Sequence, residues 1–90
     1  MANLENVLER FRRDFEPKGW TFNIGTAWKP NARLYLKFEH QPEDPRKGKQ
    51  KICITGYASG DDLALALDQA MNAAERNHAN WLAENAAQAA

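Results

Sequence analysis

Apolar residues recur at steps of three and four near the start of the chain and predict an amphipathic helix. The positions on this face are Leu4, Val7, Leu8, Phe11 and Phe15. Asn3 precedes them as a candidate N-cap, because its side chain can accept a hydrogen bond from the first turn. Pro17 and Gly19 follow and predict the end of the helix.

From Trp20 onward the apolar period changes to two, which is typical of strands with one buried face. The apolar positions are Trp20, Phe22, Ile24 and Trp28, then Leu34, Leu36 and Phe38, and finally Ile52 and Ile54. The turn residues 29–31 and the proline-containing loop 41–50 separate the three stretches. These connections leave no room for a crossover helix, so we expect an antiparallel meander.

The last third of the chain predicts a second, longer helix. Ser59 and Asp62 have the spacing of a capping box, and Asp61 and Asp62 suit the positive end of a helix dipole. The apolar stripe comprises Leu63, Leu67, Ala70, Met71 and Ala74. An alanine-rich run of high helix propensity continues it.

The C-terminal segment, residues 77–90, is either a helical extension or a frayed tail. A helix over residues 61–86 would be about 39 Å long, whereas an eight-residue strand spans about 26 Å. The apolar stripe weakens over residues 77–80 and resumes at Trp81 and Leu82. Either the tail folds back after a break, or Trp81 and Leu82 meet another molecule.

The element order predicts one α+β domain over residues 1–90. We expect a two-layer αβββα sandwich, in which a three-stranded antiparallel sheet carries both helices on one face. The other face stays uncovered, as antiparallel sheets allow. The predicted core comprises Leu4, Val7, Leu8, Phe11, Phe15, Trp20, Phe22, Ile24, Leu34, Leu36, Phe38, Ile52, Ile54, Leu63, Leu67, Ala70 and Met71.

The stretch ICITGYASGDDLALALDQAMNAA combines a glycine-containing turn, an N-cap and an alanine-rich helix. In this stretch, and in element order over roughly residues 3–76, the chain resembles the double-stranded-RNA-binding-domain fold, which toxins of the HicA type share. Members that bind double-stranded RNA grip phosphates with lysines at the start of the second helix. Asp61 and Asp62 stand there in this chain and would repel phosphates. The resemblance therefore implies the scaffold but not this activity.

The HicA-type toxins also have Gly-Trp after the first helix, here Gly19-Trp20. Their catalytic histidine follows in a Gly-Ser-His context, whereas residues 22–26 of this chain contain no histidine. His40 with Glu43 and Asp44 could be drawn as a metal site, but a proline-rich loop supplies no fixed geometry and the Cys/His spacing of a zinc site is absent. No histidine lies close enough to Cys53 in the sequence to act as its base, and phosphate-binding glycine motifs are absent. We expect a non-enzymatic binding module without a cofactor or metal.

Composition narrows the class further. A hydrophobic fraction of 43% argues against a disordered chain, and no apolar run approaches the length of a membrane span, so we expect no membrane partner. The single cysteine is typical of a reducing compartment, so we expect a cytoplasmic protein. The net charge of zero excludes a coat-like polycation. It is nevertheless the sum of +4 over residues 1–57 and −4 over residues 58–90.

Three arginines, Arg10, Arg12 and Arg13, contribute to the basic part and lie off the apolar face of the first helix. Pairs at i,i+4 are expected between Glu9 and Arg13 and between Arg10 and Asp14. The sequence leaves open whether these arginines share a face with the loop 46–49.

Two functions fit this surface. In the first, the open sheet face and the basic loop bind nucleic acid by stacking and phosphate pairing; the residues are Arg33, Tyr35, Lys37, Lys51 and Tyr57, with Arg46, Lys47 and Lys49 in the loop. In the alternative, the protein is an inhibitor or adaptor of phage or mobile-element type. It then binds a protein through the acidic C-terminal helix or the Trp81-Leu82 patch, which could also form a homodimer. An ordinary solvated sheet face is the third interpretation.

Overall fold

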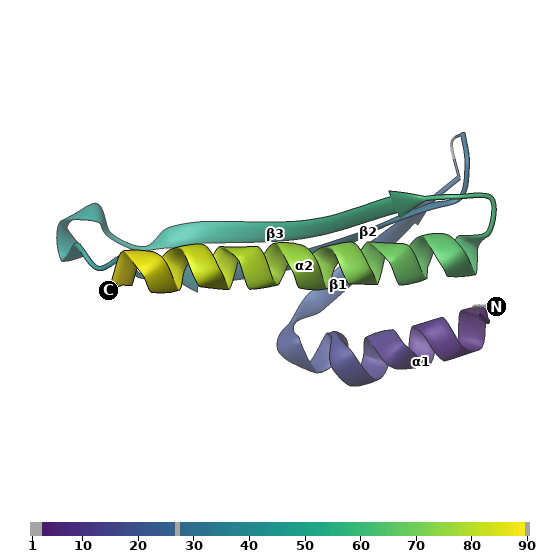
Figure 1. The fold of residues 1–90 in the computed structure, drawn as a ribbon, viewed down its shortest axis with the longest axis horizontal. Coiled ribbons are helices and arrows are strands. Elements are labelled where there is room, and N and C mark those ends of the chain that lie inside the picture. Colours follow the sequence, from purple (N-terminus) through teal and green to yellow (C-terminus); the bar gives the residue numbers. More distant parts are fainter. Residues whose placement is uncertain (1–2, 27, 90) are drawn as a thin grey trace.

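The computed structural model describes residues 3–26 and 28–89, and it confirms the αβββα order (Figure 1). In the sequence, helix α1 precedes the three strands and helix α2 follows them. A short 3₁₀ turn, η1, lies before β1, and a second, η2, lies between β2 and β3. Their bounds are α1 Leu4–Asp14, η1 Glu16–Lys18, β1 Trp20–Gly25, β2 Asn31–His40, η2 Pro45–Lys47, β3 Gln50–Ser59 and α2 Leu63–Ala89.

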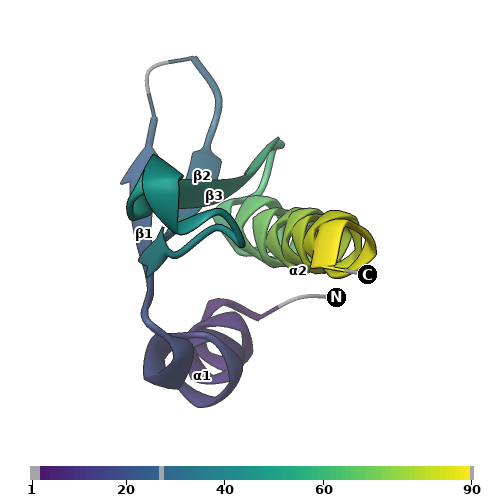
Figure 2. The same cartoon turned by 90° about the vertical axis from the view of Figure 1, so that its left-hand side faces the viewer.

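The strands form an antiparallel meander in the order β1-β2-β3. Phe22 pairs with Leu34, and Leu36 with Ile54, so the apolar positions of neighbouring strands share one face. Figure 2 shows α2 against this face and α1 beside it, next to β1. The fold class expected from the sequence, including both helices on one face of the sheet, is confirmed.

Local signals fix the ends of α1. The Asn3 side chain accepts a hydrogen bond of 2.9 Å from the backbone N–H of Glu5, as expected of an N-cap. After η1, Gly19 adopts φ of 98°, a left-handed conformation that glycine reaches without strain. The chain can therefore reverse within one residue and begin β1 at Trp20.

The start of α2 differs from the expectation. Strand β3 continues through Ser59, which pairs with Asn31, so the capping box that begins at Ser59 is wrong. Asp62 is the N-cap instead, because its carboxylate accepts from the N–H of Ala64 at 2.9 Å and its carbonyl from Ala66 at 2.9 Å.

Helix α2 lies directly on the backbone of β3 at Gly56. A Cβ atom at Gly56 would stand 2.4 Å from the backbone nitrogen of Ala74 and 2.5 Å from the carbonyl oxygen of Ala70. Side chains cannot occupy such a gap, so the helix contributes small residues there. Four alanines that were missing from the predicted core are also buried: Ala32, Ala64, Ala66 and Ala74.

Helix α2 runs without a break through residues 77–80 to Ala89, and residue 90 lies outside the described part. Strands β2 and β3 have ten residues each and are therefore about 34 Å long. Strands of this length extend beneath the helix well beyond the eight residues considered in the sequence analysis. Where the apolar stripe weakens, the Asn77 amide donates to the Thr55 carbonyl at 2.6 Å. Beyond it, Trp81 packs edge-on against Phe38, with ring centres 4.9 Å apart.

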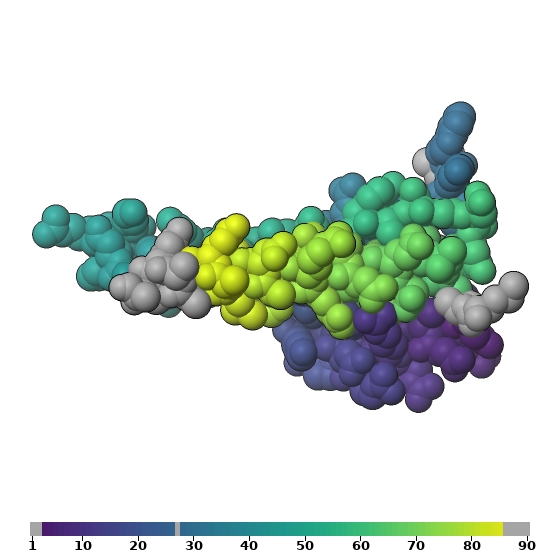
Figure 3. Space-filling view, in the orientation of Figure 1, coloured from purple at the N-terminus to yellow at the C-terminus, as the bar shows by residue number. Residues whose placement is uncertain are grey.

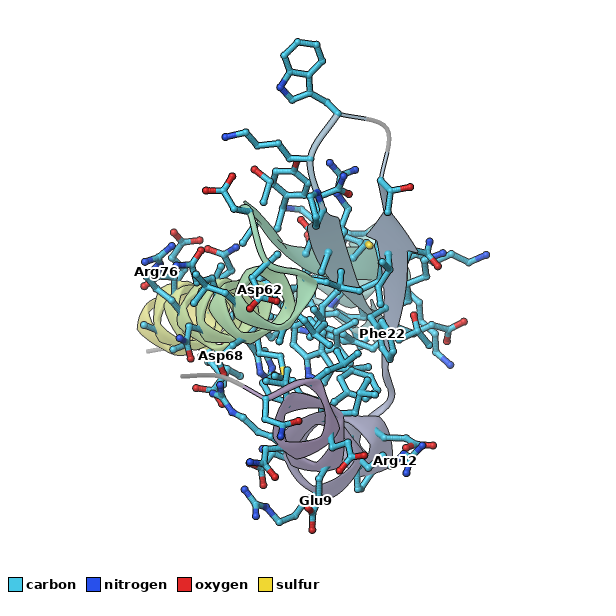
Figure 4. The ribbon with its side chains drawn as sticks, turned by 90° about the vertical axis from the view of Figure 1, so that its right-hand side faces the viewer. Glu9, Arg12, Phe22, Asp62, Asp68 and Arg76 are labelled. Carbon is cyan, nitrogen blue, oxygen red and sulfur yellow. The ribbon has the colours of Figure 1, made fainter. Side chains whose placement is uncertain are left out.

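The core otherwise follows the predicted positions. Two residues predicted for the core are instead exposed at its edge, Leu4 and Ile24. Leu4 lies in the first turn of α1, and Ile24 lies on the edge strand β1. Leu8, Phe22, Phe38 and Ile52 pack against the core while remaining partly exposed, and Leu63 is half-buried. Figure 4 shows Phe22 pointing into the space between sheet and α1, where it meets Phe11 edge-on at 4.7 Å.

Arg10 joins the two helices. Its guanidinium donates to Asp68 at 2.8 Å, to Asn72 at 3.0 Å and to Glu75 at 3.3 Å, all on α2. Arg13 instead contacts its neighbour Asp14 at 3.1 Å. These contacts take the place of the i,i+4 pairs expected from the sequence, Glu9 with Arg13 and Arg10 with Asp14.

The contact between Arg13 and Asp14 also shifts both groups. The hydrogen bond from Arg13 lowers the pKa of the Asp14 carboxyl, and the same contact raises the pKa of the Arg13 guanidinium.

Gly56→Ala tests the close approach of α2 to β3. We expect the substitution to lower the free energy of unfolding by about 3 kcal/mol, at the upper end of overpacking costs, because backbone rather than side chain blocks the new methyl group. Gly60→Ala is the matched control, since nothing lies within 4 Å of its Cβ position. Urea denaturation of both variants measures the difference, and equal stabilities would contradict the packing described.

Arg10→Ala tests the tie between the helices. We expect a loss of about 1 kcal/mol, because the ion pairs are partly exposed and such pairs contribute little individually. The loss should shrink in molar salt, which screens surface charges. The control is Arg12→Ala, at a neighbouring exposed arginine, which should leave the thermal midpoint unchanged. If Arg12→Ala destabilises the protein as much as Arg10→Ala does, the contacts of Arg10 with α2 add nothing to stability.

Candidate nucleic-acid interface

The face of the sheet opposite the helices is open over the described residues and presents the polar half of each strand. Cross-strand pairing arranges its side chains in rows. One row joins Asn23, Arg33 and Tyr57, and the next joins Thr21, Tyr35 and Thr55. Further along β2, Lys37 lies opposite Cys53, and Glu39 opposite Lys51. The strand residues predicted for the face are therefore on one surface: Arg33, Tyr35, Lys37, Lys51 and Tyr57.

Two cations of this face lie over tyrosine rings. The Arg33 guanidinium stands 5.0 Å from the centre of the Tyr57 ring, and the Lys37 ammonium 5.9 Å from that of Tyr35. Tyr57 is half exposed, whereas Tyr35 is partly buried between its neighbours. A guanidinium over a ring is a flat, positively charged platform, which suits the stacking of a base beside a phosphate.

The basic loop extends the face at the end of β2 and β3 (Figure 1). The Asp44 carboxylate accepts from the N–H of Arg46 at 3.0 Å, which fixes the start of η2. Lys49 contacts Glu39 of β2 at 3.8 Å, so the loop is tied back to the sheet. Arg46 and Lys47 are exposed beyond this contact.

The arginines of α1 do not join this surface, because α1 lies on the helix-covered side of the sheet (Figure 2). Figure 4 shows Glu9 pointing away from the sheet, with Asp68 on the side of α2 that faces α1. Arg12 lies beside the start of β1, where it lines a pocket with Trp20 and Thr21. The loop 46–49 lies at the far end of the strands. The open question from the sequence is thereby answered: the two basic clusters are separate.

Much of the acidic charge around α2 is engaged within the molecule. Asp62 caps the helix, and Asp68 and Glu75 meet Arg10. Asp61, just before the helix, contacts Lys29 at 3.7 Å. The opposing charges of the two parts of the chain therefore partly neutralise each other across the fold.

Sequence reasoning misplaced Trp28. Alternation put it in the first strand, but β1 ends at Gly25 and Trp28 is 91% exposed in the following loop. The turn residues directly after it, Lys29 to Asn31, were the available signal: the Asn31 side chain donates to the Lys29 carbonyl at 2.9 Å.

The two residues of the Trp81-Leu82 patch differ in how far they are exposed. Trp81 is half-buried, and besides Phe38 it contacts His40, with ring centres 5.2 Å apart. Leu82 is 51% exposed. Only Leu82 is thus a large exposed apolar side chain at this place.

His40 and Cys53, the two residues considered for catalytic chemistry, lie on different strands, β2 and β3. No group of three His, Cys, Asp or Glu side chains within the described residues could hold a metal ion, and Cys53 is an exposed free thiol. Over the same residues, no helix has the length and apolar character needed to cross a membrane.

Comparison with known proteins assigns no family. The chain matches no protein-family model, and no curated protein or solved structure is significantly similar to it. The structural likeness to the double-stranded-RNA-binding-domain fold therefore rests on the αβββα order alone.

Proposed function

We propose that this protein is a non-enzymatic accessory protein that binds single-stranded or irregular nucleic acid on its open sheet face. The observation that carries the proposal is the coincidence of stacking groups and cations on one uncovered surface. Arg33 and Tyr57 form its first row, and Lys37, Lys51 and the basic loop continue it. The acids of α2 lie on the other side of the sheet and do not oppose a bound phosphate.

Binding on this face combines two kinds of contact. Bases stack on Tyr57 and on the Arg33 guanidinium, and each stacked base contributes about 1–3 kcal/mol. Phosphates approach Lys37, Lys51 and the loop, where displaced counterions make the affinity salt-dependent. Flat bases must be splayed out to stack in this way, which favours single strands, loops and bulges over a regular duplex.

The start of α2 does not suit a double-stranded partner. Asp61 and Asp62 stand where the related fold places phosphate-gripping lysines, and here Asp62 is committed to capping the helix. This favours the open face over the helix terminus as the binding surface.

The double variant Lys47→Ala/Lys49→Ala tests the loop. We expect it to weaken binding to a fluorescent oligothymidylate and to reduce the salt slope of log K by about 1.4, since each lost single-strand phosphate contact accounts for about 0.7. Arg12→Ala/Lys18→Ala removes the same charge from the helix-covered side and is the matched control. Fluorescence anisotropy across a salt series measures both. An equal loss in the control would mean that binding follows net charge, and undiminished binding in the loop variant would remove the loop from the interface.

Tyr57→Leu tests stacking separately from charge. Losing one stacked base should weaken binding about 5- to 150-fold, the equivalent of about 1–3 kcal/mol, with the salt slope unchanged. Thr55→Leu, on the same strand and face, is the control. If Tyr57→Leu binds the oligothymidylate as well as the unmodified protein does, Tyr57 is not part of the platform.

A further inference from the structure

Strand β2 is longer than the strand that flanks it on the β1 side. Strand β1 pairs only with residues 31–36 of β2, since Trp20, its first residue, lies opposite Leu36. Residues 37–40 of β2 pair with β3 on one side and have no strand on the other within the described residues. This segment is an exposed strand edge, which natural proteins usually shorten, charge or cover.

The direction of the backbone groups follows from the pairing. The N–H of Gly60 donates to the Pro30 carbonyl at 3.0 Å, which continues the ladder between β2 and β3 beyond Asn31. Backbone groups alternate in direction along a strand, so even-numbered residues of β2 face β3 and odd-numbered ones face β1. Lys37 and Glu39 therefore direct their N–H and C=O groups to the side where β1 is missing.

An apolar groove adjoins this edge on the helix-covered side. Its volume is about 340 Å³, and its lining comprises Lys18, Leu36, Phe38, His78, Trp81 and Leu82. The groove exists because α1 has only 11 residues, whereas α2 has 27. Figure 3 shows α1 beneath the N-terminal part of α2 and no such cover beside the part that follows.

We propose that the C-terminal segment of a partner protein docks here as an added strand, antiparallel to β2 along residues 37–40. Strand addition satisfies the backbone groups of Lys37 and Glu39, and alternate side chains of the peptide enter the groove. The inward positions, beside Phe38 and His40, take apolar residues. The outward position opposite Lys37 takes an acidic residue, because opposite charges stabilise a cross-strand pair.

A chain terminus fits this edge better than an internal segment or a second copy. A strand antiparallel to β2 runs toward Trp20, where β1 already occupies the next position, so the added strand must stop there. A second copy's β2 would reach this end of the edge at its own His40, and its chain would then have to turn away from β1 into residues 41–49. Lys18 lies at this end of the groove and is exposed, so its ammonium complements a terminal carboxylate.

The free protein offers a first measurement, by amide hydrogen exchange. The amides of Arg33 and Tyr35, which face β1, should exchange slowly, and those of Lys37 and Glu39 rapidly. Equal protection at all four positions would mean that the edge is already closed and would overturn the proposal.

The second measurement uses a defined probe, the acetylated peptide Ser-Leu-Thr-Leu-Glu with a free C-terminal carboxylate. In an amide chemical-shift titration, the peptide should shift Lys37 and Glu39 and slow their exchange. Leu82→Arg should weaken binding at least tenfold. The control is Leu65→Arg, which replaces another exposed leucine, 43% exposed near the start of α2, and should leave peptide binding unchanged. Unmoved Lys37 and Glu39 amides at millimolar peptide, or equal effects of the two variants, would refute docking at this edge.

Amidating the peptide tests the role of Lys18. Amidation should weaken binding to the unmodified protein about tenfold and should have no effect on Lys18→Ala. Equal loss in both proteins would overturn the terminal-carboxylate assignment. Lys37 belongs to both surfaces, but this test uses no nucleic acid, so its failure and the failure of nucleic-acid binding are distinguishable.

Discussion

The contact between α2 and the backbone of β3 at Gly56 determines the rest of the structure. Because a side chain at this position would meet the backbone of Ala70 and Ala74, the helix can lie flat along the strand only if both partners stay small. Lying flat, α2 follows β3 over its whole length and brings Trp81 onto Phe38. One long helix thus covers most of one face, and the polar face is left free.

The same arrangement places many of the opposite charges that sum to a net charge of zero on different sides of the sheet. The basic residues of β2, β3 and their connecting loop lie on or beside the open face, and the acids around α2 lie behind the sheet. Arg10 crosses from α1 to meet two of these acids, and Lys29 meets a third. Arg10 and Lys29 thus neutralise acids around α2, while Arg33, Lys37 and Lys51 remain on the open face, where Glu39 is the one acid among the described strand positions. The asymmetry in the sequence becomes a difference between two faces of one domain.

Periodicity was enough to predict the elements, the antiparallel order and the two faces, because alternation along a strand assigns each side chain to a side. It could not predict features that depend on relative lengths. The cap at Asp62 rather than Ser59 follows from how far β3 pairs with β2, and the continuity of α2 at Asn77 follows from the length of the strands beneath it. The exposure of Trp28 and the open edge at Lys37 follow from where β1 stops. The role of Gly56 required the position of the helix above it.

The central claim is that the open face binds nucleic acid. The most direct measurement is an amide chemical-shift map of the protein titrated with a single-stranded oligothymidylate at 0.1 M salt. The account predicts that the largest shifts fall on β2, β3 and residues 46–49, centred on Arg33 and Tyr57, while α1 and the exposed side of α2 are unchanged. Shifts centred on α2, or no shifts at saturating oligonucleotide, would contradict it.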